Sequence, residues 1–287
     1  MELKLSTGAA CARELIKSGT YRRGVTSGAA MRRLNRAFRD LREIYDIIRS
    51  TDTHDLPQEL EWLADNRYIL QRERNTVVQA LTGLPQGHGT EPFVLALASA
   101  LMESGFASGV APSQETVMDF LRSAQQEASL TEEELYAIPV MLRLAAILFL
   151  AQPHEELLAS ARNIGRQRRS GNHVLSRRLG YAFSMLRFLA SMQLESSLPE
   201  ISVLEQIYVR DPVGAYAGMD EETKAAYRSE TARIAKRAGL SEKRAAEQIL
   251  ELAEMGEAPR ERHVGFYIYE KPLGRTKNRA ARVWYAL

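Results

Sequence analysis

Apolar residues recur every three or four positions along most of the chain. This spacing places them on one face of an α-helix. The clearest runs are Met31, Leu34, Phe38, Leu41 and Ile48; Leu63, Leu70, Val77 and Leu81; Val117, Phe120, Leu121 and Ala124; and Leu179, Phe183, Leu186 and Ala190. The pattern predicts an all-α fold, a multi-helix bundle with orthogonal or solenoid-like packing of its helices.

Residues suited to helix ends flank several of these runs. Thr131 and Glu134 have the spacing of a capping box ahead of a long apolar run. Ser241 precedes another run, and Gly105 and Gly239 are of the type that ends a helix. We therefore expect helices to begin after 131 and 241 and to end near 105 and 239.

The helical pattern is interrupted at 161–178 and again from residue 263. The first interruption divides the chain into two predicted helical halves. Residues 1–160 form the expected first half and residues 179–262 the second, with the Arg-rich stretch 161–178 as a linker or loop. Only HVGFYIYEK, 263–271, alternates with β-favouring residues. We expect an extended segment there, with at most one short strand, and a basic tail up to residue 287.

Composition narrows the classes of protein that remain. The 287 residues are 45% hydrophobic and carry a net charge of +2, so the chain can bury a core and has no global field favouring nucleic acid. Cys11 is the only cysteine, which excludes an intrachain disulfide framework and fits a reducing compartment. The longest apolar run, 138–151, contains Arg143 and is shorter than the roughly 20 residues of a spanning helix. We expect a cytoplasmic protein.

The stretch RDPVGAYAGMDEETKAAYR, 210–228, combines a turn with a helix start. Turn chemistry accounts for Asp211 and Pro212, which end a helix, for Gly214 in the turn, and for Asp220 as an N-cap. It does not explain four further residues, Tyr216, Met219, Tyr227 and Arg228.

These residues carry a resemblance to bacterial cyclic β-1,2-glucan synthases. The family reads approximately D-P-A-G-x-Y-x-x-M-D-x-x-T-R-x-x-Y-R and later H-V-G-Y-Y-L, where this chain has DPVGAYAGMDEETKAAYR and HVGFYI. EWLADN at 61–66 resembles its W-L-x-D-N motif, and LTEEELYAIPVMLRL at 130–144 resembles its L-T-x-x-E-L-W-A-x-P-x-M-L-R-L stretch. MLRFLASMQLESSLPEISVLEQI, 185–207, is similar to the segment before D-P-A-G. Lys224 stands where the family has arginine, and Glu221 where it tends to have an aromatic residue.

The resemblance implies a non-catalytic role at the inner face of the cytoplasmic membrane. In that family the matched region is the amino-terminal cytoplasmic part of a large membrane protein whose later domains include a glycosyltransferase that uses UDP-glucose. The implied partner is such a domain, on the same or a downstream polypeptide, which this helical module would position or regulate. The candidate interdomain or ligand contacts are Trp62, Asp65, Asn66, Asp211, Tyr216, Asp220, Tyr227, Arg228, His263 and Tyr267.

Two interpretations of the turn at 211–220, with Tyr227 and Arg228, remain open. It is either an interdomain contact or a buried brace between helices. The brace is favoured, because every polar group in the turn has a local hydrogen-bonding role.

We recognise no catalytic, cofactor-binding or metal-binding motif. The D-x-D and Q-x-x-R-W elements of a processive glycosyltransferase and the Walker A motif do not occur in the sequence. HEELL, beginning at His154, lacks the second histidine of a zinc protease motif.

Two basic clusters offer an alternative surface function. Residues 13–42 hold nine Lys or Arg against two acids. The second cluster contains Arg166, Arg168, Arg169, Arg177 and Arg178. Anionic lipid of the inner leaflet would attract either cluster, although a solvated helix face predicts the same pattern.

Two further function classes compete with the scaffold interpretation. Residues 234–253 have the outline of a DNA-binding helix-turn-helix, but Glu242 and Glu247 would face phosphates, so nucleic acid is not expected. A helical sugar or sugar-nucleotide binder, or an enzyme, would use aromatics such as Trp62, Tyr227 and Tyr267, which at helical spacing are more often core residues.

Overall fold

The structure, a computed structural model, describes residues 7–51, 56–87, 90–164, 172–192 and 194–273. Within these ranges the chain is helical and contains no strand, and its one β-type contact is an isolated bridge between Arg22 and Pro92. The predicted all-α fold is confirmed.

The chain folds as two compact units. Unit 1 comprises Met1–Ala128 and Tyr136–Glu195, and unit 2 comprises Ser129–Leu135 and Ser196–Leu287. This division differs from the expected one at 161–178. Residues 173–178 are helical, because Asn172 caps their helix and Leu175 and Leu179 are buried.

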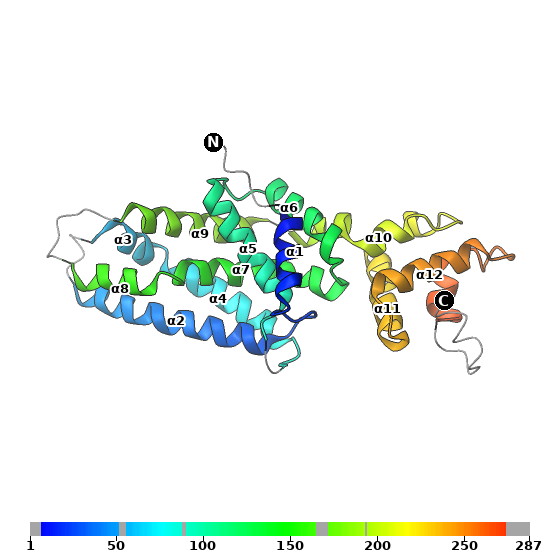
Figure 1. Ribbon diagram of the computed structural model, residues 1–287, viewed down its shortest axis with the longest axis horizontal. Helices are drawn as coiled ribbons and strands as arrows, with labels where there is room; N and C mark the ends of the chain where they lie inside the picture. Colours follow the sequence, from blue (N-terminus) through cyan, green and yellow to red (C-terminus); the bar gives the residue numbers. More distant parts are fainter. Residues whose placement is uncertain (1–6, 52–55, 88–89, 165–171, 193, 274–287) are drawn as a thin grey trace. The chain divides into compact units, whose positions relative to one another are not determined.

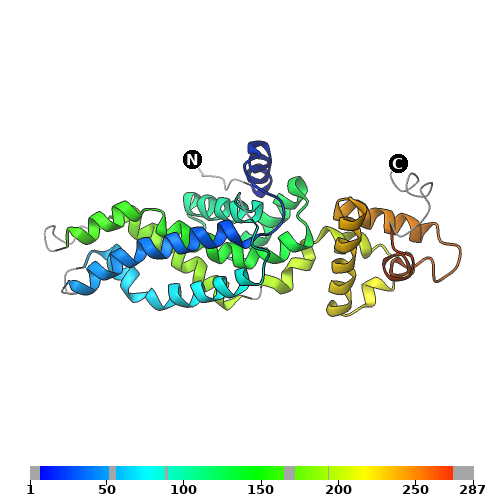
Figure 2. The same cartoon turned by 90° about the horizontal axis from the view of Figure 1, so that it is seen from below.

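Unit 1 is built around an apolar helix, α7 (Glu132–Ala151), whose first four residues belong to unit 2. Met141, Leu142 and Leu144 on α7 are all 0% exposed. Figures 1 and 2 show α2 and α4 running side by side, and α2 also contacts α8. The other helices of unit 1 are α1 (Gly8–Ser18), α2 (Ser27–Ser50), α3 (Gln58–Asp65), α4 (Arg67–Thr82), α5 (Phe93–Ser108), α6 (Gln114–Ala128), α8 (His154–Arg162) and α9 (His173–Ser191).

Helix α7 is the one described helix long and apolar enough to span a bilayer. Within the protein, however, 78% of its most apolar window is buried. That burial is typical of a core helix in a water-soluble fold.

Unit 2 packs its helices around buried aromatic side chains. Tyr208 and Tyr216 are both 0% exposed, and their ring centroids lie 5.4 Å apart. After a 3-10 helix at Leu194–Ile201, the elements are α10 (Val203–Tyr208), a 3-10 turn at Tyr216–Gly218, α11 (Glu221–Ala238), α12 (Glu242–Glu254) and a π-helical turn at Phe266–Glu270.

The extended segment expected from residue 263 is wrong for the described residues. Residues 264–265 are α-helical and Phe266–Glu270 form the π-turn. Val264, Tyr267 and Ile268 all face the core of unit 2, and this three-to-four spacing is helical rather than alternating. The run is too short for its period to be read from the sequence.

Most of the expected helix ends are confirmed. Thr131 and Glu134 exchange hydrogen bonds of 3.1 and 3.2 Å as a capping box, and Gly239 ends α11 with a φ of 71°. Gly105 is the exception, since α5 continues to Ser108. A Cβ at Gly105 would lie 2.0 Å from the Tyr181 hydroxyl, so this glycine serves close packing of α5 on α9 instead.

Candidate functional site

Asp211 is the centre of the polar network in unit 2. Its side chain is 0% exposed. One carboxylate oxygen accepts from the Val264 N–H at 2.9 Å, and the other accepts from the Ala215 and Tyr216 N–H groups at 3.1 and 3.4 Å. Asp211 therefore fastens the turn after α10 to the start of the final helical turn.

His263 and Tyr227 extend this network toward the surface. His263 Nδ1 lies 3.0 Å from Asp211, and its Nε2 lies 3.2 Å from the Tyr227 hydroxyl. This is the geometry of a base held by a carboxylate. Burial, with the neighbouring Tyr269 and Asp211, raises the pKa of Tyr227, so its phenol stays protonated and is no nucleophile at neutral pH.

Arg228 is a buried cation surrounded by carboxylates of unit 2. Its side chain is 1% exposed, and its guanidinium lies 3.2 Å from Glu132 and 2.8 Å from Glu205, with Glu221 as a third partner. Glu132 also accepts from the hydroxyl of Ser202. The fork of the guanidinium thus joins α7, α10 and the start of α11.

Glu205 connects this cation to the aromatic core. It accepts from the Tyr216 hydroxyl at 2.7 Å and from Lys224 at 3.1 Å. Burial tends to raise the pKa of Glu205, but these hydrogen bonds and the charges of Lys224 and Arg228 outweigh it and lower the pKa. The carboxylate is therefore held ionised, and the burial of Tyr216 beside it raises the pKa of that phenol.

Two further predicted site residues of unit 2 have structural positions. Asp220 caps α11, accepting from the Thr223 N–H at 2.8 Å. Tyr267 is 8% exposed and belongs to the core, with its ring against Phe266. The structure thus brings seven of the predicted contacts together in one unit: Asp211, Tyr216, Asp220, Tyr227, Arg228, His263 and Tyr267.

The remaining predicted contacts lie in unit 1. Trp62 stacks on Phe183 of α9, with centroids 6.4 Å apart. Asn66, at the junction of α3 and α4, donates to the Trp62 carbonyl at 2.8 Å and accepts from Arg187. Asp65 is exposed. Trp62 and Asn66 therefore hold α3 and α4 against α9.

The basic residues predicted to face lipid are described only in part. Arg166, Arg168 and Arg169 lie outside the described residues. Arg178 donates to the Phe149 carbonyl at 3.0 Å, and its side chain is 15% exposed. Little of this side chain is therefore accessible to a lipid headgroup. Arg177 is exposed, with its guanidinium 4.5 Å from the Phe106 centroid.

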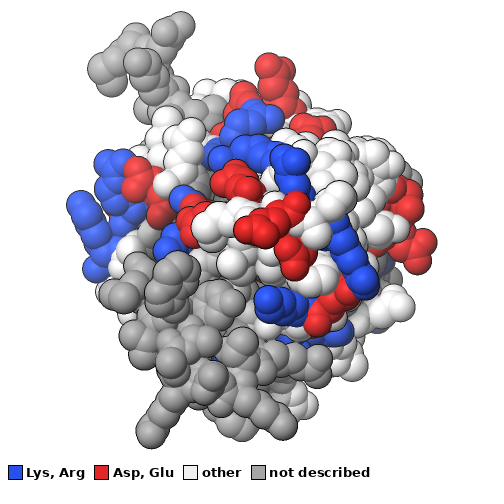
Figure 3. All heavy atoms as spheres, turned by 90° about the vertical axis from the view of Figure 1, so that its right-hand side faces the viewer, with Lys and Arg blue, Asp and Glu red and all other residues white. Residues whose placement is uncertain are grey.

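The helix-turn-helix outline corresponds to α11 and α12, but its cations have carboxylate neighbours. Lys243 lies 3.9 Å from Glu247, and Arg244 lies 3.6 Å from Glu251. On the face in Figure 3, seen from the side where Figure 1 draws these helices, basic and acidic side chains are interspersed. Among the described residues of α11 and α12, these cations lie beside acids rather than gathered as DNA phosphates require.

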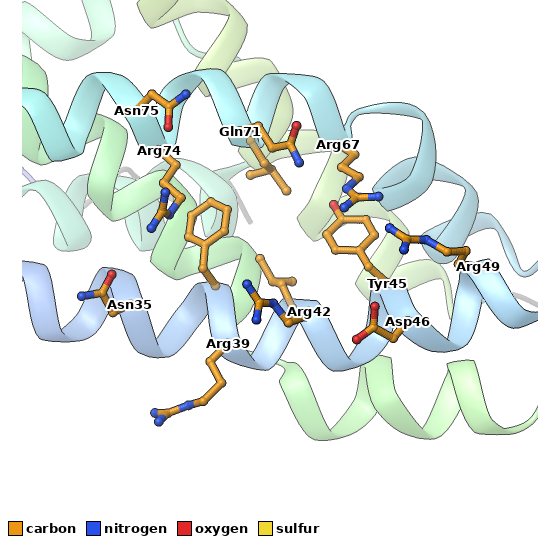
Figure 4. A pocket seen from close by; sticks show the side chains of 13 residues that line it. Asn35, Arg39, Arg42, Tyr45, Asp46, Arg49, Arg67, Gln71, Arg74 and Asn75 are labelled. Atoms are coloured by element: carbon orange, nitrogen blue, oxygen red, sulfur yellow. The ribbon is translucent and has the colours of Figure 1, made fainter.

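A groove between α2 and α4 is the feature that the sequence did not reveal. It has a volume of about 900 Å³ and lies in unit 1 (Figure 4). Its polar and charged lining residues are Asn35, Arg39, Arg42, Asp46, Arg49, Arg67, Gln71, Arg74 and Asn75. Arg39 and Arg42 belong to the basic cluster noticed in the sequence, but the other arginines come from later positions, and only the fold brings the two helices together.

The described residues contain no group of three or more His, Cys, Asp or Glu side chains suited to a metal ion.

Comparison with known proteins assigns the chain to no family. No protein-family model matches the chain, and no curated protein matches it.

Proposed function

We propose that this chain is a non-catalytic helical module of a membrane glycosyltransferase resembling the cyclic β-1,2-glucan synthases. Its role is to dock against the transferase domain at the inner face of the membrane and to position or regulate it. The proposal begins from the collinear motifs of the sequence and gains support from where those motifs lie in the fold.

The observation that carries the proposal is that the matched segments contact one another through polar groups. In unit 1, Asn66 binds Arg187, and Arg143 donates to the Leu189 carbonyl at 2.7 Å. In unit 2, Glu132 binds Arg228, and Asp211 binds the Val264 N–H. The residues behind the resemblance are thus the ones that fasten helices together, which supports a scaffold and favours the brace over an interdomain contact.

Two of the departures from the family pattern, at Glu221 and Lys224, fit the same network. Glu221, in place of an aromatic residue, is the third partner of Arg228. Lys224, in place of arginine, keeps a cation 3.1 Å from Glu205. The substitutions change individual partners and preserve a charged centre.

Catalysis provides the first test. Purified chain incubated with UDP-glucose should neither release UDP nor incorporate labelled glucose into polymer. When the tagged chain is purified from native membranes in mild detergent, UDP-glucose-dependent transferase activity should co-purify with it. Breakdown of UDP-glucose by the purified chain alone would overturn the scaffold role. If no transferase activity is recovered with the tagged chain, a transferase is not its partner.

One feature favours a sugar-binding module as a second candidate. Tyr227 and Tyr269 meet edge to face at 5.1 Å, and Tyr269 is 49% exposed, which leaves an aromatic surface on which a pyranose ring can stack. Titration with β-1,2-glucooligosaccharides, followed by tyrosine fluorescence, separates the two candidates. If the chain is only a scaffold, its tyrosine fluorescence shows no saturable change with added oligosaccharide.

A further inference from the structure

The groove between α2 and α4 gathers positive charge in a concave space. Its volume of about 900 Å³ is within the range of small-molecule sites. Among the described residues that line it, five arginines stand against one carboxylate, Asp46. Leu41 and Leu70, each 1% exposed, supply an apolar floor.

Four of these arginines have no acidic partner within the described part of the chain. Arg42, Arg49, Arg67 and Arg74 form no ion pair there. Other arginines of unit 1 do form such pairs, as Arg33 does with Glu91 and Arg162 with Glu43. The groove therefore concentrates positive charge that no acid within the described residues compensates.

Two of the guanidinium groups are held in place by aromatic rings. Arg67 lies 5.1 Å from the Tyr45 centroid, and Arg74 lies 5.3 Å from the Phe38 centroid. Tyr45 is itself fixed, because its hydroxyl donates to the Leu63 carbonyl at 3.1 Å. Stacking through the face of a guanidinium leaves its N–H edge available to an anion.

The spacing of the arginines suits more than one anionic group. Arg42 and Arg49 on α2, like Arg67 and Arg74 on α4, are two helical turns apart, or about 10 Å along the axis. Figure 4 shows these side chains extending from both helices around the space between them, with Gln71 at its centre. A single carboxylate would engage one guanidinium fork, whereas several phosphate groups can engage both rows.

We propose that this arginine groove binds a ligand with clustered phosphate groups, either a small soluble polyphosphate or the headgroups of anionic phospholipid. The inference concerns unit 1 alone and does not depend on the function proposed above. Each guanidinium binds phosphate oxygens through its N–H edge, and the polar amides of Asn35 and Asn75 lie at one end of the groove.

The test compares two double variants that remove the same charge. Arg42→Gln/Arg49→Gln removes two cations of the groove. The control, Arg36→Gln/Arg210→Gln, removes two exposed arginines outside the groove lining. Calorimetry with tripolyphosphate and with inositol hexakisphosphate measures soluble binding, and co-sedimentation with phosphatidylglycerol or phosphatidylcholine vesicles measures headgroup binding. Equal melting temperatures of the two variants establish that both are folded.

We expect the groove variant to bind at least tenfold more weakly than the unaltered chain and the control to change less than twofold. Saturable binding of the soluble phosphates identifies a small ligand. Binding only to phosphatidylglycerol vesicles, lost in the groove variant, identifies the headgroup. The proposal is overturned if the folded chain binds none of these probes, if both variants lose affinity equally, or if a short DNA duplex binds tighter than every phosphate probe.

Discussion

Asp211 shows how much structure one side chain can organise. Its carboxylate accepts from the N–H groups of Ala215, Tyr216 and Val264 and from His263, while no part of the side chain is exposed. The N–H groups of Tyr216 and Val264 belong to buried residues, and a buried donor left without an acceptor costs about 1 to 3 kcal/mol. A residue that looks like a turn former in the sequence is therefore a fastening point of unit 2.

Asp211→Asn is the sharpest test of this role. The amide keeps one acceptor oxygen but directs an NH2 group at donors that need an acceptor, so we expect a loss of about 2 to 3 kcal/mol in the free energy of unfolding. Urea denaturation followed by circular dichroism measures it. Asp65→Asn, at an exposed position, is the matched control. Equal midpoints for the two variants would contradict the assignment.

At the scale of the element, helix ends are fixed by residues close together in the sequence. Asp220 accepts from the Thr223 N–H, and Ser241 accepts from the Arg244 N–H at 3.2 Å. Each cap supplies an acceptor for an N–H group that has no partner within its own helix.

Removing the cap of α11 should weaken unit 2 modestly. We expect Asp220→Ala to lower the melting temperature by about 2 to 4 °C, because the first turn loses its side-chain acceptor. Asp220→Asn restores an acceptor at the same place and should recover most of the loss. Calorimetric scans of the three proteins decide the matter, and equal melting of the Ala and Asn variants would show that the cap does not act.

This locality explains what the sequence could predict. The capping box of Thr131 with Glu134 and the caps at Asp220 and Ser241 depend on residues three positions apart, so they could be recognised directly. The π-turn at 266–270 cannot be predicted, because Val264, Tyr267 and Ile268 are too few to distinguish a helical from an alternating period. The position of Gly105 inside α5 cannot be predicted either, because the Tyr181 hydroxyl that requires a glycine there lies on another helix.

At the scale of the whole molecule, unit 2 is completed by a segment from elsewhere in the chain. Ser129–Leu135 lies among the residues of unit 1 in the sequence but belongs to unit 2. Glu132, in this segment, meets Arg228 and the hydroxyl of Ser202, and its N–H donates to Glu242 at 2.8 Å. Stability of the second unit therefore depends on a residue far from it in sequence.

Glu132→Gln should weaken unit 2 selectively. The change removes one of the three carboxylates around Arg228, and the loss of a hydrogen-bonded partner by a buried group costs about 1 to 3 kcal/mol. Hydrogen exchange followed by mass spectrometry should show faster exchange in α11 and α12, with α2 and α4 unchanged. Glu133→Gln, at an exposed neighbour, is the control. Uniformly faster exchange through both units would show instead that they unfold together.

Neither the division into units nor the arginine groove could be predicted from the sequence, and for a shared reason. The partners of Glu132 lie 70 and 110 residues further along, at Ser202 and Glu242. The groove joins Arg42 on one helix to Arg67 on another. Periodicity predicts which face of a helix is buried, but it carries no information about which helices become neighbours.

The early position of Ser129–Leu135 in the sequence also affects folding during synthesis of the protein. As the chain leaves the ribosome, Glu132 emerges 70 residues before Ser202 and 110 before Glu242. At about 5 to 20 residues per second, the last of these partners follows on the order of 5 to 20 s later. Until residue 242 has emerged, the hydrogen bond from Glu132 to Glu242 cannot form, so the second unit closes only after α12 has been synthesised.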